Sequence, residues 1–152
     1  MIVVDTSAVL ASKDESHRHH AEVAEVMADT REELLLSSFV VAESDYVLAT
    51  RLGHGAARDF LGDVAAGAYD LIEFADTDVA SANGIIDRYE DLRIGITDAS
   101  LVVIAAQYQT PRVLTFDHRH FRAIAPLWGA PAFTLLPADA DSSRPTRRPH
   151  VQ

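Results

Sequence analysis

The feature that most constrains the fold is the alternation of short apolar segments with longer helical ones. Strand-like runs rich in Val, Ile and Leu are predicted at residues 2–5, 33–37, 69–74, 112–116 and 132–136. Between them, helical patterns are predicted at residues 7–11, 20–30, 39–52, 56–66, 78–89 and 97–108. The crossovers between the strands are too long for hairpins, so the strands are expected to run parallel. The sequence therefore predicts an α/β fold, with a mostly parallel sheet of four to five strands and helices on both faces.

Turn and capping residues set the expected ends of several helices. Gly53 is expected to close the helix at 39–52, and Pro111 to prevent continuation of the helix at 97–108. Thr77 is a candidate cap for the helix at 78–89, and either Thr97 or Asp98 for the helix at 97–108.

The chain length of 152 residues fits one domain that can bury a core of its own. We expect the domain to span residues 1–137, with a disordered tail rich in Pro, Arg and Ser at residues 138–152. The chain has no cysteine, which excludes disulfides and thiolate sites and fits a cytoplasmic protein. No apolar run approaches the roughly 20 residues of a membrane span, so no membrane association is expected.

The formal net charge is −10, which argues against a broad basic surface for nucleic acid. Arginine accounts for all the basic residues except Lys13, and arginine is suited to bidentate contact with phosphate. An acidic protein can still act on RNA if divalent cations neutralise its carboxylates. The charge alone therefore leaves a nucleic-acid substrate open.

Four acidic residues fall where a parallel sheet binds its ligands, at the carboxyl ends of strands. Asp5 ends the first strand, and Asp117 follows the fourth. Glu43 and Asp98 lie near the starts of two helices, where the helix dipole favours a carboxylate. Each acid alone is also readable as a turn residue, a cap or an exposed first-turn acid. Together they predict a cluster at one edge of the sheet.

Carboxylates that converge in this way repel one another unless a cation lies between them. An all-oxygen set without cysteine suits Mg²⁺ or Mn²⁺ rather than zinc. The hydroxyls of Thr6, Ser7 and Thr115 are expected to orient these carboxylates or to hold a bound water.

Four motifs, in this order, carry a resemblance to a known family. They are MIVVDTSAV at the N-terminus, VVAES around Glu43, GITDASLVVIAA around Asp98 and VLTFDHRHF around Asp117. In order and spacing they resemble the PIN domains of the small bacterial toxins of the VapC type, from residue 1 to about Leu136. Any one motif is weak, but four in sequence are a specific signal.

The resemblance implies a three-layer α/β/α sandwich and a metal-dependent endoribonuclease. By analogy Asp5, Glu43, Asp98 and Asp117 would be Mg²⁺ or Mn²⁺ ligands, directly or through water, and hydrolysis would leave 5′-phosphate and 3′-hydroxyl ends. The family also implies an RNA substrate (tRNA, rRNA or mRNA), a small antitoxin as the inhibitory partner, and a homodimer. Apolar helix surfaces within residues 39–66 are candidates for the antitoxin or dimer contact.

Basic residues near the motifs are candidates for RNA contact. They are Arg93, Arg112, Arg119 and His118. Each arginine is equally readable as a partner in a surface ion pair. His118 stands where the family frequently has Arg or Lys, and with His120 it is readable either as a phosphate contact or as part of a hydrogen-bonded surface turn.

A second histidine group, His17, His19 and His20, has the composition of a metal-binding tract. Its neighbours include Lys13, Asp14, Glu15 and Arg18, as expected of a solvated loop or helix start.

Two alternative functions stay open. The chain could be a PIN-like binding or regulatory module whose metal site is idle in the cell, although it retains all four acids. It could instead be a nuclease directed at DNA, although 152 residues leave little room for elements that thread a DNA strand.

Overall fold

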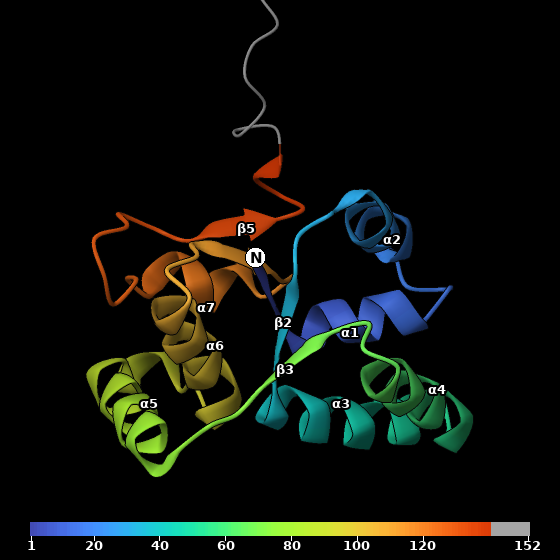
Figure 1. Cartoon of the computed structure of the whole chain (residues 1–152), viewed down its shortest axis with the longest axis horizontal. Coiled ribbons are helices and arrows are strands. Elements are labelled where there is room, and N and C mark those ends of the chain that lie inside the picture. Colours follow the sequence, from blue (N-terminus) through green and yellow to red (C-terminus); the bar gives the residue numbers. More distant parts are fainter. Residues whose placement is uncertain (141–152) are drawn as a thin grey trace, which may run out of the picture.

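Five parallel strands form the central sheet of the computed structural model, which describes residues 1–140 (Figure 1). Across the sheet the order is β3 (Asp70–Ile72), β2 (Leu34–Ser37), β1 (Ile2–Val4), β4 (Arg112–Leu114) and β5 (Thr134–Leu136). Each neighbouring pair is parallel. The predicted α/β class and parallel sheet are confirmed. The first strand of the chain is also the central one.

Helices cover both faces of this sheet. They are α1 (Thr6–Lys13), α2 (His20–Asp29), α3 (Ser38–Arg51), α4 (His54–Ala65), α5 (Asp76–Arg88), α6 (Ile96–Gln107) and α7 (His118–Ala123), with a short 3₁₀ helix, η1 (Glu90–Leu92). Figure 1 shows α1, α2 and α4 on one side of the strands and α5, α6 and α7 on the other. This is the three-layer arrangement that the resemblance implied.

The core forms where α6 packs on the middle of the sheet. All three residues of β1 are fully buried, and so is nearly every residue of α6 from Ala99 to Ala105. Helix α6 contacts β1 and β2 on one side and α5 on the other. Because it is enclosed in this way, its sequence is apolar all round rather than on one stripe. The burial fixes the N-terminus of α6 beside the end of β1.

The turn between α3 and α4 depends on Gly53, whose φ of 96° lies in the left-handed region that favours glycine. The predicted closure of α3 at this residue is confirmed. The turn reverses the chain and lets α3 and α4 pack against each other.

Several predicted boundaries are wrong. Helix α6 is capped at Gly95 rather than at Thr97 or Asp98, because the Asp98 carboxylate reaches back to accept the N–H of Gly95 at 3.2 Å. Helix α5 likewise begins before the expected cap Thr77, with its N-cap at Ala75. Helix α7 was not predicted at all.

The C-terminal prediction is only partly within the described residues. Residues 138–140 form a turn in which the Asp139 carboxylate accepts hydrogen bonds from Arg122 at 2.6 and 2.8 Å and from the N–H of Leu135 at 2.8 Å. This turn packs with the domain. The rest of the expected tail, residues 141–152, lies outside the described part of the chain.

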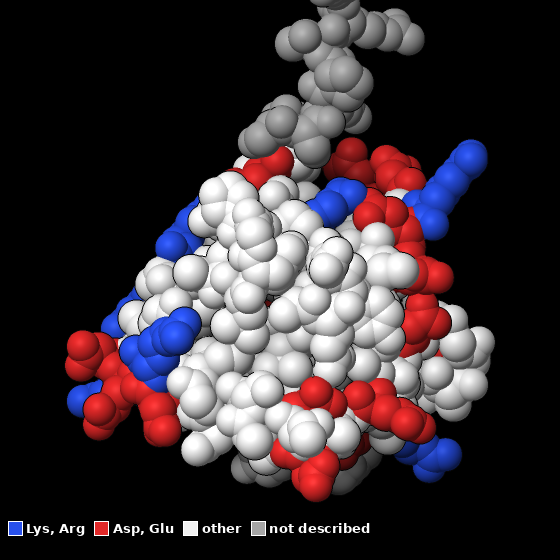
Figure 2. Space-filling model, turned by 60° about the vertical axis from the view of Figure 1, so that its left-hand side comes forward, with Lys and Arg blue, Asp and Glu red and all other residues white. Residues whose placement is uncertain are grey.

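The surface of the side that carries α5–α7 is shown in Figure 2. Charged side chains lie mainly around its rim, and uncharged residues fill its centre. The sequence from residue 123 to residue 138, which leads into and out of β5, contains no charged residue. This face therefore offers no broad basic surface, as the net charge predicts. None of the helices within residues 1–140 is long and apolar enough to span a membrane.

Candidate active site

Asp5 lies at the end of the central strand and is 5% exposed. It ends β1 and caps α1: its Oδ1 accepts the N–H of Thr6 at 2.7 Å. Its Oδ2 accepts the hydroxyls of Ser7 at 2.6 Å and Thr115 at 2.7 Å. Burial raises the pKa of Asp5 and the charge of Asp98 adds to that rise, while the two hydroxyls oppose it. The protein thus holds a carboxylate that is costly to ionise.

The two hydroxyls also join β1 to the segment that follows β4. Thr115 Oγ1 accepts the N–H of Asp117 at 2.9 Å, and Ser7 Oγ accepts the N–H of Phe116 at 2.9 Å. Thr115 is fully buried. Both supporting residues therefore fix the path of the backbone that carries Asp117, as well as the rotamer of Asp5.

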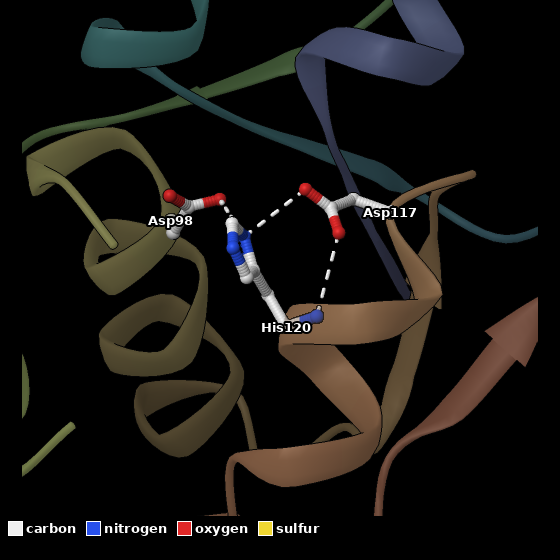
Figure 3. Close-up of side chains that lie close together, drawn as sticks. All are labelled: Asp98, Asp117 and His120. Atoms are coloured by element: carbon white, nitrogen blue, oxygen red, sulfur yellow. Dashed lines mark hydrogen bonds and ion pairs between the residues drawn. The ribbon is translucent and has the colours of Figure 1, made fainter. Parts of the chain in front are cut away.

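Asp98, Asp117 and His120 form the second part of the site (Figure 3). Asp98 is the third residue of α6, Asp117 is the N-cap of α7, and His120 is the third residue of α7. His120 Nδ1 lies 3.0 Å from Asp117 Oδ2 and 3.6 Å from Asp98 Oδ1. One possible ligand atom from each of the three residues lies within 4.8 Å of the others. The side chains are 22%, 37% and 18% exposed, which leaves the cluster open to a ligand.

Glu43 reaches the same edge from α3, the helix that follows β2. Its carboxylate accepts the hydroxyl of Thr6, the residue next to Asp5. Strands β2 and β4 flank β1 in the parallel sheet, so the segments that follow the three strands lie at the same edge. These segments carry Glu43, Asp117 and Asp5. The four predicted acids thus gather there, with Asp98 and Asp117 in one cluster and Glu43 linked through Thr6.

The four predicted RNA-contacting residues are distributed unequally. His118 and Arg119 are exposed in the first turn of α7, next to the cluster. Arg93 is exposed and has a φ of 53°, two residues before the cap of α6. Arg112 begins β4 at the opposite edge of the sheet, where it pairs with Glu32. The structure therefore does not bring Arg112 to the carboxylates.

The histidine tract packs beside the site. The ring of His19 stacks on Phe116, with centroids 4.3 Å apart and planes 10° apart, and His17 lies at 6.2 Å from the same ring. His20 Nδ1 lies 2.9 Å from the carbonyl oxygen of Ala11. The metal-binding group found within residues 1–140 does not include these histidines. Their observed contacts hold the loop before α2 against Phe116.

His120 is the residue that sequence reasoning missed. The sequence allowed it to be either a phosphate contact or part of a hydrogen-bonded surface turn, and not a member of the acidic cluster. The available signal was the spacing: a cap at Asp117 and a side chain three residues later lie on the same side of a short helix. The unpredicted α7 therefore accounts for the missed residue.

Hollows lie near both ends of the strands. Two of them, of about 720 and 340 Å³, are at the edge opposite the acids, and Ile2, Glu32 and Arg112 line part of the larger one. A smaller hollow of about 180 Å³ adjoins the acidic edge, since Ser7 and Phe116 form part of its wall. This smaller hollow lies beside the acidic edge, although none of the four predicted acids lines it.

The donor set fits a divalent cation. Carboxylate oxygens dominate it, and such oxygens suit Mg²⁺ and Mn²⁺. Burial is the main cause of the raised pKa of Asp5, and the charge of Asp98 adds to it. A cation held by Asp98 and Asp117 would offset the charge of Asp98. Such a site can polarise a phosphate ester and activate water.

Comparison with known proteins gives a family match. The model of the family described as PIN domain matches residues 2–126. Over 136 residues the chain is 41% identical to Ribonuclease VapC26 of Mycobacterium tuberculosis (strain ATCC 25618 / H37Rv). The aligned region covers 90% of this chain and all of that protein.

Solved structures have the same fold. One is the crystal structure of Mycobacterium tuberculosis VapC20, described as a sarcin-ricin loop cleaving toxin, with a TM-score of 0.73 and 19% identity over 78% of this chain and 91% of that one. Another is VapBC2 from Rickettsia felis bound to a DNA fragment from its promoter, with a TM-score of 0.61 and 19% identity over 85% of this chain and all of that one. A toxin–antitoxin complex from Klebsiella pneumoniae has a TM-score of 0.60 and 13% identity over 85% of this chain and 97% of that one. At these identities the likeness shows the fold alone.

Proposed function

The chain belongs to the PIN domain family, and from this premise we propose that it is a metal-dependent endoribonuclease, the toxin of a toxin–antitoxin pair. The observation that carries the proposal is the convergence of Asp5, Asp98 and Asp117 at the ends of β1 and β4, in a chain 41% identical to a ribonuclease. Buried or crowded carboxylates are destabilising without a cation, so their presence together has a functional explanation.

In this proposal Asp98 and Asp117 hold Mg²⁺ or Mn²⁺ directly, and Asp5 and Glu43 hold it directly or through water. When bound, the ion polarises the scissile phosphate and lowers the pKa of a water, whose attack leaves 5′-phosphate and 3′-hydroxyl ends. The protein's own contribution is orientation. Ser7 and Thr115 fix the carboxylate of Asp5 by two short hydrogen bonds.

The RNA backbone is proposed to meet exposed basic side chains beside the carboxylates. His118 and Arg119 flank the cluster on α7, and Arg93 precedes α6. Arg112 is left out of this surface because it pairs with Glu32 at the other edge. Contacts of this kind position the phosphates and carry little sequence information. The choice among tRNA, rRNA and mRNA therefore rests on RNA shape.

The proposed partner is a small antitoxin, supported by structural neighbours that are toxin–antitoxin complexes. A cationic side chain of the antitoxin pointed at Asp98 and Asp117 would neutralise the site and exclude a metal ion. A homodimer is also proposed, by analogy with the family. An RNA substrate and an antitoxin partner fit a protein of the cytoplasm.

Cleavage of a mixed tRNA and rRNA pool tests the proposal. Wild type, Asp5→Asn and the exposed control Asp87→Asn are each incubated with Mg²⁺, Mn²⁺ or EDTA, and the same series is run on single-stranded and duplex DNA. Discrete RNA fragments with 5′-phosphates are expected from wild type and Asp87→Asn with metal, and none from Asp5→Asn.

Two results would contradict the proposal in different ways. Equal behaviour of wild type and Asp5→Asn would favour a binding module with an idle site. Preferential cleavage of DNA would favour the DNA-directed alternative.

A further inference from the structure

His120 has a ring nitrogen that the site described so far does not use. Its Nδ1 is inaccessible to solvent and, among the described residues, makes no well-aligned hydrogen bond. It is nevertheless aimed between two carboxylates, with Asp117 Oδ2 at 3.0 Å and Asp98 Oδ1 at 3.6 Å (Figure 3). A buried polar atom without a partner is costly and calls for an explanation.

The spacing of these atoms is that of ligands around one small cation. Two ligands at right angles, each bonded at about 2.1 Å, lie roughly 3.0 Å apart. The distance between His120 Nδ1 and Asp117 Oδ2 matches this value, and the distance to Asp98 Oδ1 exceeds it by a few tenths of an ångström. An ion bound between these atoms would give Nδ1 a direct bond in place of the hydrogen bond that it does not make.

The position of the imidazole of His120 is fixed by a backbone hydrogen bond and by the packing of the next residue in the core. The N–H of His120 donates to Asp117 Oδ1 at 3.3 Å, which leaves Oδ2 facing the ring. The next residue, Phe121, is 1% exposed and packs edge-on against Phe133, with centroids 6.0 Å apart. This anchor holds α7, and with it the direction of the imidazole.

We propose that His120 is a metal ligand through Nδ1, so that the site combines imidazole nitrogen with the carboxylates of Asp98 and Asp117. Nitrogen ligands favour first-row transition ions, whereas Mg²⁺ selects oxygen. The site accordingly prefers Mn²⁺ or a related transition ion to Mg²⁺. This inference rests on the proposed function, because it concerns the same metal site.

Electron paramagnetic resonance with Mn²⁺ as the probe tests the inference on the full chain without any activity measurement. Electron spin echo modulation detects nitrogen bonded directly to Mn²⁺. Wild type is expected to give a ¹⁴N signal that changes to ¹⁵N when histidine is labelled. His120→Gln is expected to lose the signal and to bind Mn²⁺ about tenfold more weakly, with a smaller change for Mg²⁺. His54→Gln, an exposed histidine at the start of α4, is the control.

The outcomes separate this inference from the proposed function. The role of His120 is overturned if Mn²⁺ binds wild type without a nitrogen signal and His120→Gln keeps the same preference for Mn²⁺ over Mg²⁺. The carboxylate site would then stay in place. Absence of Mn²⁺ binding to wild type overturns the inference on His120, and absence of both Mn²⁺ and Mg²⁺ binding overturns the proposed function as well. If His120→Gln does not fold, the isotope change in labelled wild type decides alone.

Discussion

The hydroxyl of Thr115 lies 2.7 Å from the Oδ2 of Asp5, and so joins the ends of two adjacent parallel strands by a side-chain hydrogen bond. The same hydroxyl oxygen accepts the N–H of Asp117. One buried threonine therefore positions two acids that are separated by more than a hundred residues in the sequence. The geometry of the site depends on this residue although it is not itself a proposed ligand.

Thr115→Val removes both hydrogen bonds and keeps the shape of the side chain. We expect a loss of about 1–3 kcal/mol in the free energy of unfolding, because the N–H of Asp117 and one oxygen of Asp5 lose a partner. Metal affinity is expected to fall about 10- to 100-fold. Urea unfolding and calorimetric titration with Mn²⁺ measure the two effects. Thr134→Val, at the half-buried start of β5, is the matched control and should leave metal affinity unchanged.

Asp5→Asn should stabilise the metal-free protein at neutral pH. Burial raises the pKa of Asp5 in the folded protein. Protonation of Asp5 therefore favours the folded state: this contribution to stability is complete below the ordinary pKa of about 4 and is lost as the pH rises through the pKa of the folded state. The variant lacks this loss, so its advantage should grow with pH to about 1 kcal/mol or more. Unfolding in EDTA from pH 5 to 8 measures the difference. A constant difference would show that Asp5 does not titrate abnormally.

Asp98→Asn and Asp117→Asn should each lower RNA cleavage by about 100-fold or more, because each removes an anionic ligand from the proposed ion. Asp98→Asn should also reduce the pH dependence of stability, since the charge of Asp98 contributes to the raised pKa of Asp5. Cleavage kinetics and pH-dependent unfolding check the two effects. The exposed Asp87→Asn should match wild type in both; full activity in either site variant would remove that residue from the ligand set.

Added Mn²⁺ should raise the melting temperature of wild type and EDTA should reverse the rise. An ion at one hundred times its dissociation constant stabilises the folded state by about 2.7 kcal/mol. Asp117→Asn should show little of this response. Scanning calorimetry across a metal series tests it, and an equal rise in both proteins would place the ion elsewhere.

Ser37→Ala should weaken the contact between the two helices that carry Glu43 and Asp98. Ser37 is fully buried, caps α3 by accepting the N–H of Phe39 at 3.2 Å, and lies hydroxyl to hydroxyl with Ser100 of α6 at 2.8 Å. The expected cost is about 1–2 kcal/mol. The neighbouring Ser38→Ala, exposed in the first turn, is the control for urea unfolding. Equal stability of the two variants would contradict this role.

The sequence predicts the strands, the parallel sheet and the four acids, because these depend on local signals. The run from Ile2 to Val4 is apolar throughout, as a fully enclosed strand must be. Asp5 stops that run. Such features follow from residue order alone.

What the sequence does not predict depends on side chains that reach back along the chain or across it. The cap of α6 shifts to Gly95 because Asp98 bonds to its N–H. Helix α7 consists of HRHFRA, in which Phe121 is the single buried residue. One apolar position in six residues gives no periodic pattern from which a helix could be predicted. The role of His120 depends on the approach of α6 to α7, which no local signal encodes. Arg112 was misplaced although the sequence puts it at the start of the strand predicted at 112–116, at the end opposite Asp117.

The central position of β1 also has a consequence for the timing of synthesis. The first strand to leave the ribosome becomes part of the site only when β4, more than a hundred residues later, docks beside it and brings Thr115 and Asp117. A chain that has been synthesised only as far as α6 therefore lacks Thr115 and Asp117, and with them part of the proposed metal site.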